Sequence, residues 1–391
     1  MKKLLFIHKH FYPDTPPYAN MLLDIAKEMS NEGYKVNILT AMPSYKSFKQ
    51  SVSNENIEGV TVNRLHLVST FFKNTKLKFL DFFYFPIRVF IYLLFHKYNA
   101  ITVSTAPPVI LGFLVALICR LKNTKLIYHC MDIHPEIGRI SGEFSNNYVF
   151  RFLRFLDNFT LNTAYKTIVL SDDMIESINE RNSSTNIIVI NNFALKDNNE
   201  HKIKTIKHVE CGKVKILFAG NVGRYQGLES LVLAFNQLPN DVNLELLFLG
   251  DGQTVSVLKE LSKHENIQFS GHVTIDEAKL IMSQSDFGIV SLQENIINFA
   301  YPSKIMTYLE QGIPLIALVE NSSALSKFID VENIGFHVEN DDIESILDLL
   351  NNISRLSDNV GFTKEHIVDV YNNNFHFDCA MKKWKKIFSE I

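Results

Sequence analysis

Short apolar runs alternate with longer amphipathic segments along this chain, and the alternation breaks once and then restarts. Residues 4–8 are apolar, residues 18–33 carry apolar side chains at helical spacing, and residues 34–40 are apolar again. Glycine at position 33 suits a helix end, and the second strand follows almost at once, as a parallel crossover requires. The first half is therefore predicted to be a doubly wound α/β domain.

The break is a polar stretch without periodicity at residues 194–202, after which strand-like and helical patterns return from residue 213. A chain of 391 residues also exceeds the usual size of a single core. We predict an N-terminal Rossmann-like domain, a linker, a C-terminal Rossmann-like domain, and a final amphipathic helix that packs back toward the N-terminal domain: 1–195, 196–212, 213–375 and 376–391.

Charge and composition exclude several classes of function. A formal net charge of −3 gives no general attraction for nucleic acid. The four cysteines are scattered without a CxxC pair, which indicates neither a zinc site nor a disulfide framework. The apolar N-terminal run stops at His8, Lys9 and His10, so it is interpreted as a strand of a cytoplasmic protein and not as a signal peptide.

A glycine-spaced turn follows the strand predicted at 214–219. Here Gly220, Asn221, Gly223, Arg224 and Gln226 lead into a helix. Glycines allow close backbone approach, and a helix N-terminus attracts anions, so the turn is a candidate diphosphate loop; a tight turn without a ligand is the equal alternative.

A second candidate anion site begins at Pro302, which is suited to the start of a helix. Ser303 and Lys304 then fall in the first turn, where a lysine is unfavourable for the helix dipole unless an anion shares the site. This misfit predicts a bound phosphate.

These motifs resemble those of family-four glycosyltransferases, in particular the proline-serine-lysine subgroup that assembles bacterial surface polysaccharides and is similar to N-acetyl-fucosamine transferases. Similar segments occur in the family's order over nearly the whole chain: 11–19, 104–108, 132–136, 220–223, 250–252, 271–273, 285–286 and 302–314.

The resemblance implies a GT-B fold, with two Rossmann-like domains facing a central cleft, and transfer with retention at the anomeric carbon. The C-terminal domain would hold a nucleotide-sugar donor, most commonly UDP-linked, and the N-terminal domain a polyprenyl-diphosphate-linked glycan of O-antigen or capsule synthesis. Carried onto this chain, Gly220 to Gln226 with Ser303 and Lys304 would bind the diphosphate, and Arg224 and Lys304 would stabilise the leaving group. Gly271, His272 and Val273 would border the base, and Pro17 and Tyr18 lie in the matching first loop.

One departure from the wider family concerns two glutamates eight positions apart. Phe299 and Thr307 stand at those positions. Glu310 lies one helical turn after Thr307 and could contact the ribose, although a surface glutamate near a helix end is the likelier alternative.

A second group of candidates follows the apolar run at 126–128. Asp132 and Glu136 could bind an acceptor hydroxyl and handle its proton, with Glu136 the more interesting of the two carboxylates and His129 in the same loop. The equally weighted alternative is that Asp132 caps the loop, while His129 is a core histidine. His134 is interpreted as structural.

No metal site and no cofactor are predicted. Asp251 stands alone between two glycines, which is typical of a turn. We expect basic side chains and helix N-termini to replace magnesium in the reaction.

The segment 71–95 is the most aromatic of the chain, and Asp81, Pro86 and Arg88 interrupt it. It is therefore too polar to span a bilayer. It suits either the interface of an anionic membrane, which would place the protein peripherally on the cytoplasmic face, or ordinary buried helices.

Two other functions fit parts of the sequence. GT-B architecture also serves sugar-nucleotide epimerases, because a fold does not fix a function. The missing glutamate pair would also fit a non-catalytic partner of another transferase.

Overall fold

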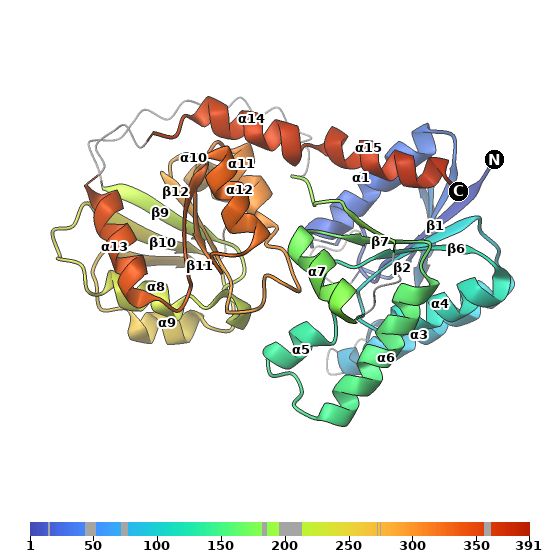
Figure 1. Cartoon of the computed structure of the whole chain (residues 1–391). Coiled ribbons are helices and arrows are strands. Elements are labelled where there is room, and N and C mark those ends of the chain that lie inside the picture. Colours follow the sequence, from blue (N-terminus) through green and yellow to red (C-terminus); the bar gives the residue numbers. More distant parts are fainter. Residues whose placement is uncertain are drawn as a thin grey trace. The chain divides into compact units, whose positions relative to one another are not determined.

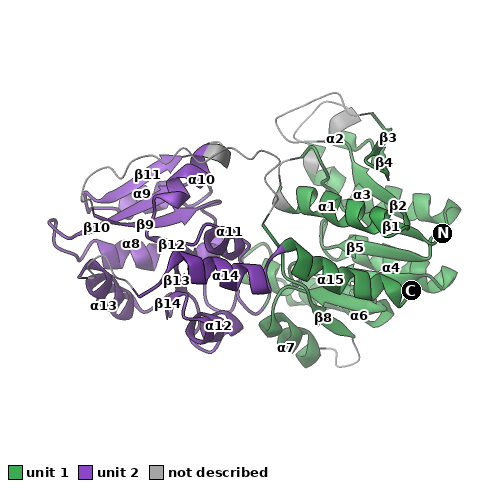
Figure 2. Cartoon of the chain, turned by 90° about the horizontal axis from the view of Figure 1, so that it is seen from above, with its two compact units in different colours: residues 1–195, 299–301, 377–391 green, residues 196–298, 302–376 purple. Residues whose placement is uncertain are grey.

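The computed structural model describes residues 1–14, 16–43, 52–71, 77–181, 186–194, 213–271, 273, 275–355 and 361–391. Two compact units divide the chain (Figure 2). Unit 1 contains Met1–Leu195, Phe299–Tyr301 and Phe377–Ile391, and unit 2 contains Lys196–Asn298 and Pro302–His376. The linker expected at 196–212 lies outside the described residues.

Unit 1 is built on an eight-stranded sheet with the order β3-β4-β2-β1-β5-β6-β7-β8, in which all neighbours are parallel except β3 and β4. Its strands are β1 (Lys3–Ile7), β2 (Lys35–Ala41), β3 (Asn54–Ile57), β4 (Val60–Leu65), β5 (Ala100–Ser104), β6 (Lys125–His129), β7 (Lys166–Val169) and β8 (Ile187–Val189).

Helices cover both faces of this sheet, which is why its central strands are apolar on both sides. Along β1, Leu4 and Phe6 join the core on one face, and Leu5 and Ile7 join the core on the other. Unit 1 has the helices α1 (Pro17–Asn31), α2 (Val68–Phe71), α3 (Lys78–Phe95), α4 (Ile110–Lys122), α5 (Glu136–Ile140), α6 (Asn147–Thr163), α7 (Asp172–Arg181) and α15 (Phe377–Ser389).

The C-terminal helix α15 packs beside α1 in unit 1 (Figure 1). Its apolar face buries Trp384 and Phe388 against Phe6 of β1. The predicted return of this helix to the N-terminal domain is confirmed.

Unit 2 has a six-stranded parallel sheet with the order β11-β10-β9-β12-β13-β14. Its strands are β9 (Val214–Ala219), β10 (Leu244–Leu249), β11 (Ile267–Gly271), β12 (Phe287–Ser291), β13 (Leu315–Leu318) and β14 (Gly335–Val338). Its helices, with a 3-10 turn η2 at Arg224–Gln226, are α8 (Glu229–Phe235), α9 (Val255–Leu261), α10 (Ile275–Ser283), α11 (Lys304–Glu310), α12 (Ala324–Glu332), α13 (Ile343–Ser354) and α14 (Lys364–Asn374).

The structure departs from the expected division at Phe299–Tyr301, which belongs to unit 1 although the flanking residues belong to unit 2. The amide of Ile133 donates to the carbonyl of Phe299 (2.8 Å), and Asp132 and Ala300 form an isolated antiparallel bridge. Hydrogen bonding to a loop of the first unit is a long-range contact that hydrophobic periodicity cannot reveal.

Candidate functional site

The glycine-spaced loop of unit 2 leaves the carboxyl end of β9, as the sequence predicts. Gly220 adopts a φ of +121°, a conformation that L side chains rarely adopt. The next loop packs directly on it, because a Cβ on Gly250 would lie 2.1 Å from the carbonyl oxygen of Gly220. Asp251 accepts the amide proton of Gly252 (2.8 Å), which is a turn contact.

Lys304 opens α11 and reaches this loop. A Cβ built on Gly220 would lie 3.8 Å from its Nζ, and Nζ donates to Oε1 of Gln226 (3.4 Å). The ammonium also lies over the ring of Phe218, 3.5 Å from the centroid, where the π face attracts a cation. Burial lowers the pKa of Lys304 to about 7. The structure thus brings Gly220, Gln226 and Lys304 together around one half-buried amine.

The position of Lys304 depends on how α11 is held against the sheet. The hydroxyl of Tyr308, one turn along α11, accepts the amide of Ala219 (2.8 Å) and donates to the carbonyl of Leu217 (3.3 Å). The Tyr308 ring packs over Gly288, where a Cβ would come within 2.5 Å of it. These contacts place the first turn of α11 at the end of β9.

Gln226 is fixed by two residues that the sequence analysis missed. Its carbonyl oxygen accepts hydrogen bonds from the Ser291 hydroxyl and from Nδ2 of Asn340 (3.1 Å). Ser291 is the last residue of β12, and Asn340 follows β14. Their position at the end of a strand was the only signal in the sequence that could have identified them. Fixing this carbonyl holds the Gln226 side chain within reach of Lys304.

The remaining diphosphate candidates, apart from Gly223, are open to solvent. Arg224 in η2 and Asn221 are exposed, and Gly223 is buried beneath the amide of Asn221. Ser303 precedes α11, is exposed, and makes no side-chain capping bond there. Their assignment to a donor stays a prediction.

The candidates for the base and the ribose lie at the end of β11 and at the end of α11. Gly271 ends β11 with a φ of +66°, and no described atom lies within 4 Å of a Cβ built there. Val273 is half-buried, and His272 lies outside the described residues. Glu310 ends α11 about 9 Å along the helix axis from Lys304. Its carboxylate accepts a long hydrogen bond from Gln311 (3.5 Å).

A cavity of about 520 Å³ in unit 2 begins at Gly227 on the same loop. Its lining is strongly acidic: Gly227, Glu229, Ser230, Leu292, Gln293, Glu294, Glu320, Glu339, Asn340 and Asp341. Because like charges repel, this cavity is a poor site for a diphosphate, and Lys304 marks the better one.

In unit 1, Tyr18 and His129 contact each other. The Tyr18 hydroxyl and Nδ1 of His129 are 2.7 Å apart, and the His129 ring packs against Trp384. Burial lowers the pKa of His129 to about 3, so its imidazole is neutral. Pro17 begins α1, one residue before Tyr18. His129 thus occupies a core position that orients Tyr18, in agreement with the core alternative.

Asp132 lies in the loop that follows β6. Burial raises the pKa of its carboxyl group to about 6. Its backbone is held by the bridge to Ala300 and by the Cys130 thiol, which lies 3.5 Å from the Asp132 carbonyl oxygen. A carboxyl group that titrates near neutrality can exchange a proton with a hydroxyl.

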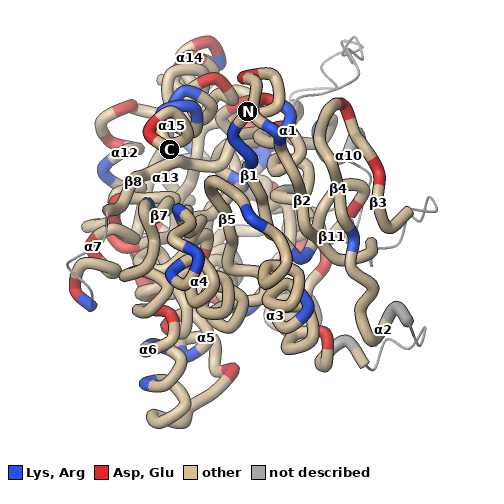
Figure 3. Tube along the Cα trace, turned by 90° about the vertical axis from the view of Figure 1, so that its right-hand side faces the viewer, with Lys and Arg blue, Asp and Glu red and all other residues tan. Residues whose placement is uncertain are grey.

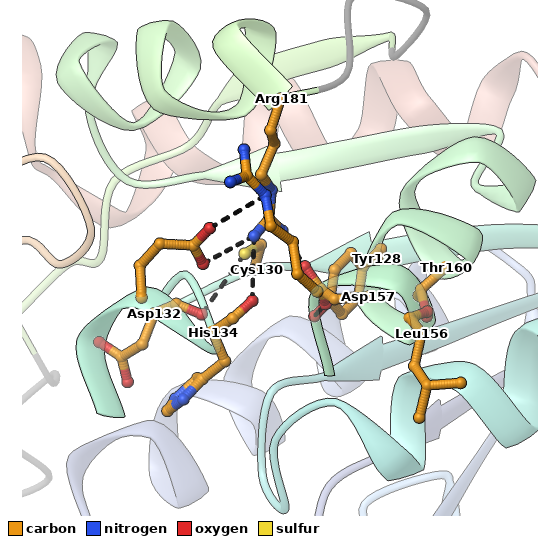
Figure 4. A network of polar contacts seen from close by, with 10 residues as sticks. Tyr128, Cys130, Asp132, His134, Leu156, Asp157, Thr160 and Arg181 are labelled. Carbon is orange, nitrogen blue, oxygen red and sulfur yellow. Dashed lines mark hydrogen bonds and ion pairs between the residues drawn. The ribbon is translucent and has the colours of Figure 1, made fainter. Parts of the chain in front are cut away.

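Glu136 is held instead in a network of ion pairs. Its carboxylate contacts Nη1 of Arg181 (2.7 Å) and Nε of Arg154 (3.6 Å). Arg181 also pairs with Asp157 and donates to the carbonyl of His134 (3.1 Å). Figure 4 shows Arg181 extending from α7 toward Asp157 and His134.

The network continues to β6, since the Tyr128 hydroxyl donates to Asp157 (2.7 Å). It therefore ties α5, α6 and α7 to the loop that carries Asp132. Arg181 and Asp157 were not predicted from the sequence, because buried charges on distant helices leave no local pattern. A carboxylate neutralised by arginine is better suited to position this loop than to accept a proton, so Asp132 is the stronger candidate of the two.

Sequence comparison matches residues 199–364 to the family described as "Glycosyl transferases group 1". The probable glycosyltransferase WbjE of Pseudomonas aeruginosa is 24% identical to this chain over 66% of its residues. The match covers 66% of the length of WbjE, which is just under two thirds. The putative colanic acid biosynthesis glycosyl transferase WcaI of Escherichia coli K12 is 20% identical over 88% of this chain and 90% of that protein.

Among solved structures, Anabaena Alr3699/HepE in complex with UDP superposes with a TM-score of 0.69 at 13% identity, covering 100% of both chains. At this identity the likeness concerns the fold alone. Residues 199–364 thus match the glycosyltransferase group 1 family, and the chain has the two-domain α/β fold of the GT-B type.

Proposed function

We propose that this protein transfers a sugar, with retention at the anomeric carbon, from a UDP-linked donor to a polyprenyl-diphosphate-linked glycan during synthesis of a surface polysaccharide such as O-antigen or capsule. The observation that carries the proposal is the half-buried amine of Lys304 beside Gly220 and Gln226. WbjE and WcaI, whose names describe glycosyltransferases, and the UDP complex of HepE add support.

In this proposal, the donor diphosphate lies against the β9 loop and the first turn of α11. Negative charge develops on the leaving nucleoside diphosphate as the glycosidic bond breaks. The ammonium of Lys304, with Arg224 from the exposed side of the loop, stabilises this charge in the transition state. Lys304 contributes most, because partial burial strengthens its interaction with an anion.

Unit 1 supplies the acceptor side of the reaction. Asp132 accepts a hydrogen bond from the attacking hydroxyl, and its raised pKa allows it to take part in the proton transfer near neutral pH. The ion-pair network around Arg181 holds the loop that carries Asp132 in place. The enzyme would act at the cytoplasmic face of the membrane, where its acceptor is anchored.

The test is a transfer assay with a panel of nucleotide sugars and a polyprenyl-diphosphate-linked glycan, read by mass spectrometry and by NMR of the new linkage. We expect an extended glycan whose anomeric configuration matches that of the donor. An inverted linkage would contradict retention, and conversion of the nucleotide sugar without transfer would indicate an epimerase. Donor binding without either reaction would favour the non-catalytic role.

A further inference from the structure

Helices α3 and α6 of unit 1 each expose a stripe of large apolar side chains. On α3 these residues recur about every four positions: Phe79, Phe83, Ile87, Ile91, Leu94 and Phe95. On α6 they are Tyr148, Phe152 and Phe155, which are 82%, 61% and 65% exposed. A spacing of three or four residues places each set on one side of its helix.

The two stripes belong to the same face of the unit 1 sheet. Helix α4 lies between α3 and α6 and contacts both. Phe85 and Val89 of α3 and Leu161 of α6 enter the core beneath them, so the exposed stripes point away from the sheet. Lys122 of α4 also donates to the carbonyls of Leu94 (2.8 Å) and His96 (3.0 Å) at the end of α3.

The charged residues on these three helices are mostly basic. They carry six basic residues, at 78, 88, 120, 122, 151 and 154, and two acidic residues, Asp81 and Asp157. Both acids are buried: Asp81 accepts hydrogen bonds from Ser69, and Asp157 pairs with Arg181. The described charged side chains of these helices that are exposed, Arg120 and Arg151, are therefore positive. Figure 3 shows the basic segments along α4 and α6.

We propose that α3, α4 and α6 form a lipid-binding face that seats unit 1 on an anionic bilayer. Exposed aromatic and aliphatic side chains that share their helices with exposed cations match the headgroup region of an anionic bilayer, which is apolar beneath a negatively charged surface. Among the described residues, no helix is both long and apolar enough to cross a membrane, so the contact is interfacial. This deepens the proposed function by identifying the surface that meets the lipid carrying the acceptor.

The face is also connected to the candidate acceptor loop. The side of α6 opposite Phe152 and Phe155 carries Arg154 and Asp157, which pair with Glu136 and Arg181. The same helix that rests on lipid therefore holds the loop that begins at Asp132. Docking would fix the height of this loop above the bilayer, where a lipid-linked sugar is presented.

The test is cosedimentation of the full chain with vesicles of phosphatidylcholine, with or without phosphatidylglycerol. We expect binding to the anionic vesicles, and a decrease in affinity of at least about tenfold for the double variant Phe152→Ser/Phe155→Ser. The matched control removes two exposed apolar side chains from unit 2, Val257→Ser/Val331→Ser, and should bind as the unchanged protein does.

Charge is tested separately by Arg151→Glu, which should weaken binding to anionic vesicles about fivefold or more, against the exposed Lys386→Glu on α15 as control. Because Trp384 is the single tryptophan and is buried, a Phe155→Trp variant reports on the face itself. Its emission should shift to the blue with anionic vesicles.

Equal vesicle binding by the α6 variant and the unchanged protein, or an unshifted Phe155→Trp emission, would overturn the proposal. So would a dimer in light scattering that Phe152→Ser/Phe155→Ser dissociates, since the face would then be an interface between two copies. UDP binding, measured by thermal shift on the same variants, separates failure here from failure of the proposed transferase.

Discussion

Two buried or half-buried cations, one in each unit, differ in the partners they have. Arg181 in unit 1 contacts two carboxylates and a carbonyl oxygen. Lys304 in unit 2 has a glutamine oxygen and an aromatic ring, and no described carboxylate pairs with it. A cation with a full set of anionic partners stabilises the fold, whereas a desolvated cation without one is poised to bind an anion.

The largest expected effect on stability comes from breaking the unit 1 network. Arg181→Met leaves Glu136 and Asp157 without their main cation, and should lower the free energy of unfolding by about 3–5 kcal/mol. Urea unfolding measures this change. The control Arg154→Met, at the partly exposed partner of Glu136, should change it by less than about 1 kcal/mol. Equal decreases in the free energy of unfolding for Arg181→Met and Arg154→Met would contradict the special structural role of Arg181.

Lys304→Met should show the opposite pattern. Transfer activity should fall by about 10²–10³-fold, because a preorganised cation is lost from the leaving-group site. The melting temperature without ligand should not decrease, because methionine removes an amine that burial already disfavours as a cation. Activity close to that of the unchanged protein would exclude Lys304 from the site.

Asp132→Asn should lower transfer by about 100-fold, which is within the usual range for a positioned acid or base. In the unchanged protein, kcat/KM should rise with pH around a midpoint near 6, as the Asp132 carboxyl group loses its proton. The folded-state pKa is raised above the unfolded value, so the ionised carboxylate is unfavourable in the folded protein at neutral pH. Asparagine should therefore not lower stability at pH 7. If kcat/KM of Asp132→Asn still decreases at acidic pH as in the unchanged protein, another group is responsible for that decrease.

The smallest expected effect is that of a metal chelator. If Lys304, Arg224 and the β9 loop carry the charge stabilisation, EDTA should leave the transfer rate unchanged within error. Restoration of an EDTA-inhibited rate by magnesium would show that the basic residues are not sufficient.

The sequence predicted the parallel architecture well, because strands buried on both faces produce continuous apolar runs such as 4–8 and 214–219. It did not predict β3 and β14, which are short and only partly buried. The return of α15 to unit 1 followed from its amphipathic pattern, whereas the transfer of Phe299–Tyr301 to unit 1 had no local signal.

Residues of the candidate site could be predicted where a local sequence motif marks them. Gly220 and Lys304 both mark strand-to-helix turns, and parallel strands bring such turns to one edge. Asn340 and Arg181 were missed because their roles depend on contacts across more than forty residues of sequence. Glu136 was identified as a candidate, but its pairing with Arg181 depends on that same long-range packing.

The most direct test of the central claim is titration calorimetry of UDP binding across pH, on the unchanged protein, Lys304→Met and the exposed control Lys327→Met. Burial lowers the pKa of Lys304 to about 7, so binding of a diphosphate above that pH requires uptake of a proton. Affinity should therefore fall by up to about tenfold per pH unit above 7 in the unchanged protein and in Lys327→Met. In Lys304→Met, binding should be weak and nearly independent of pH. The same affinity and pH dependence in all three proteins would contradict a donor site at Lys304.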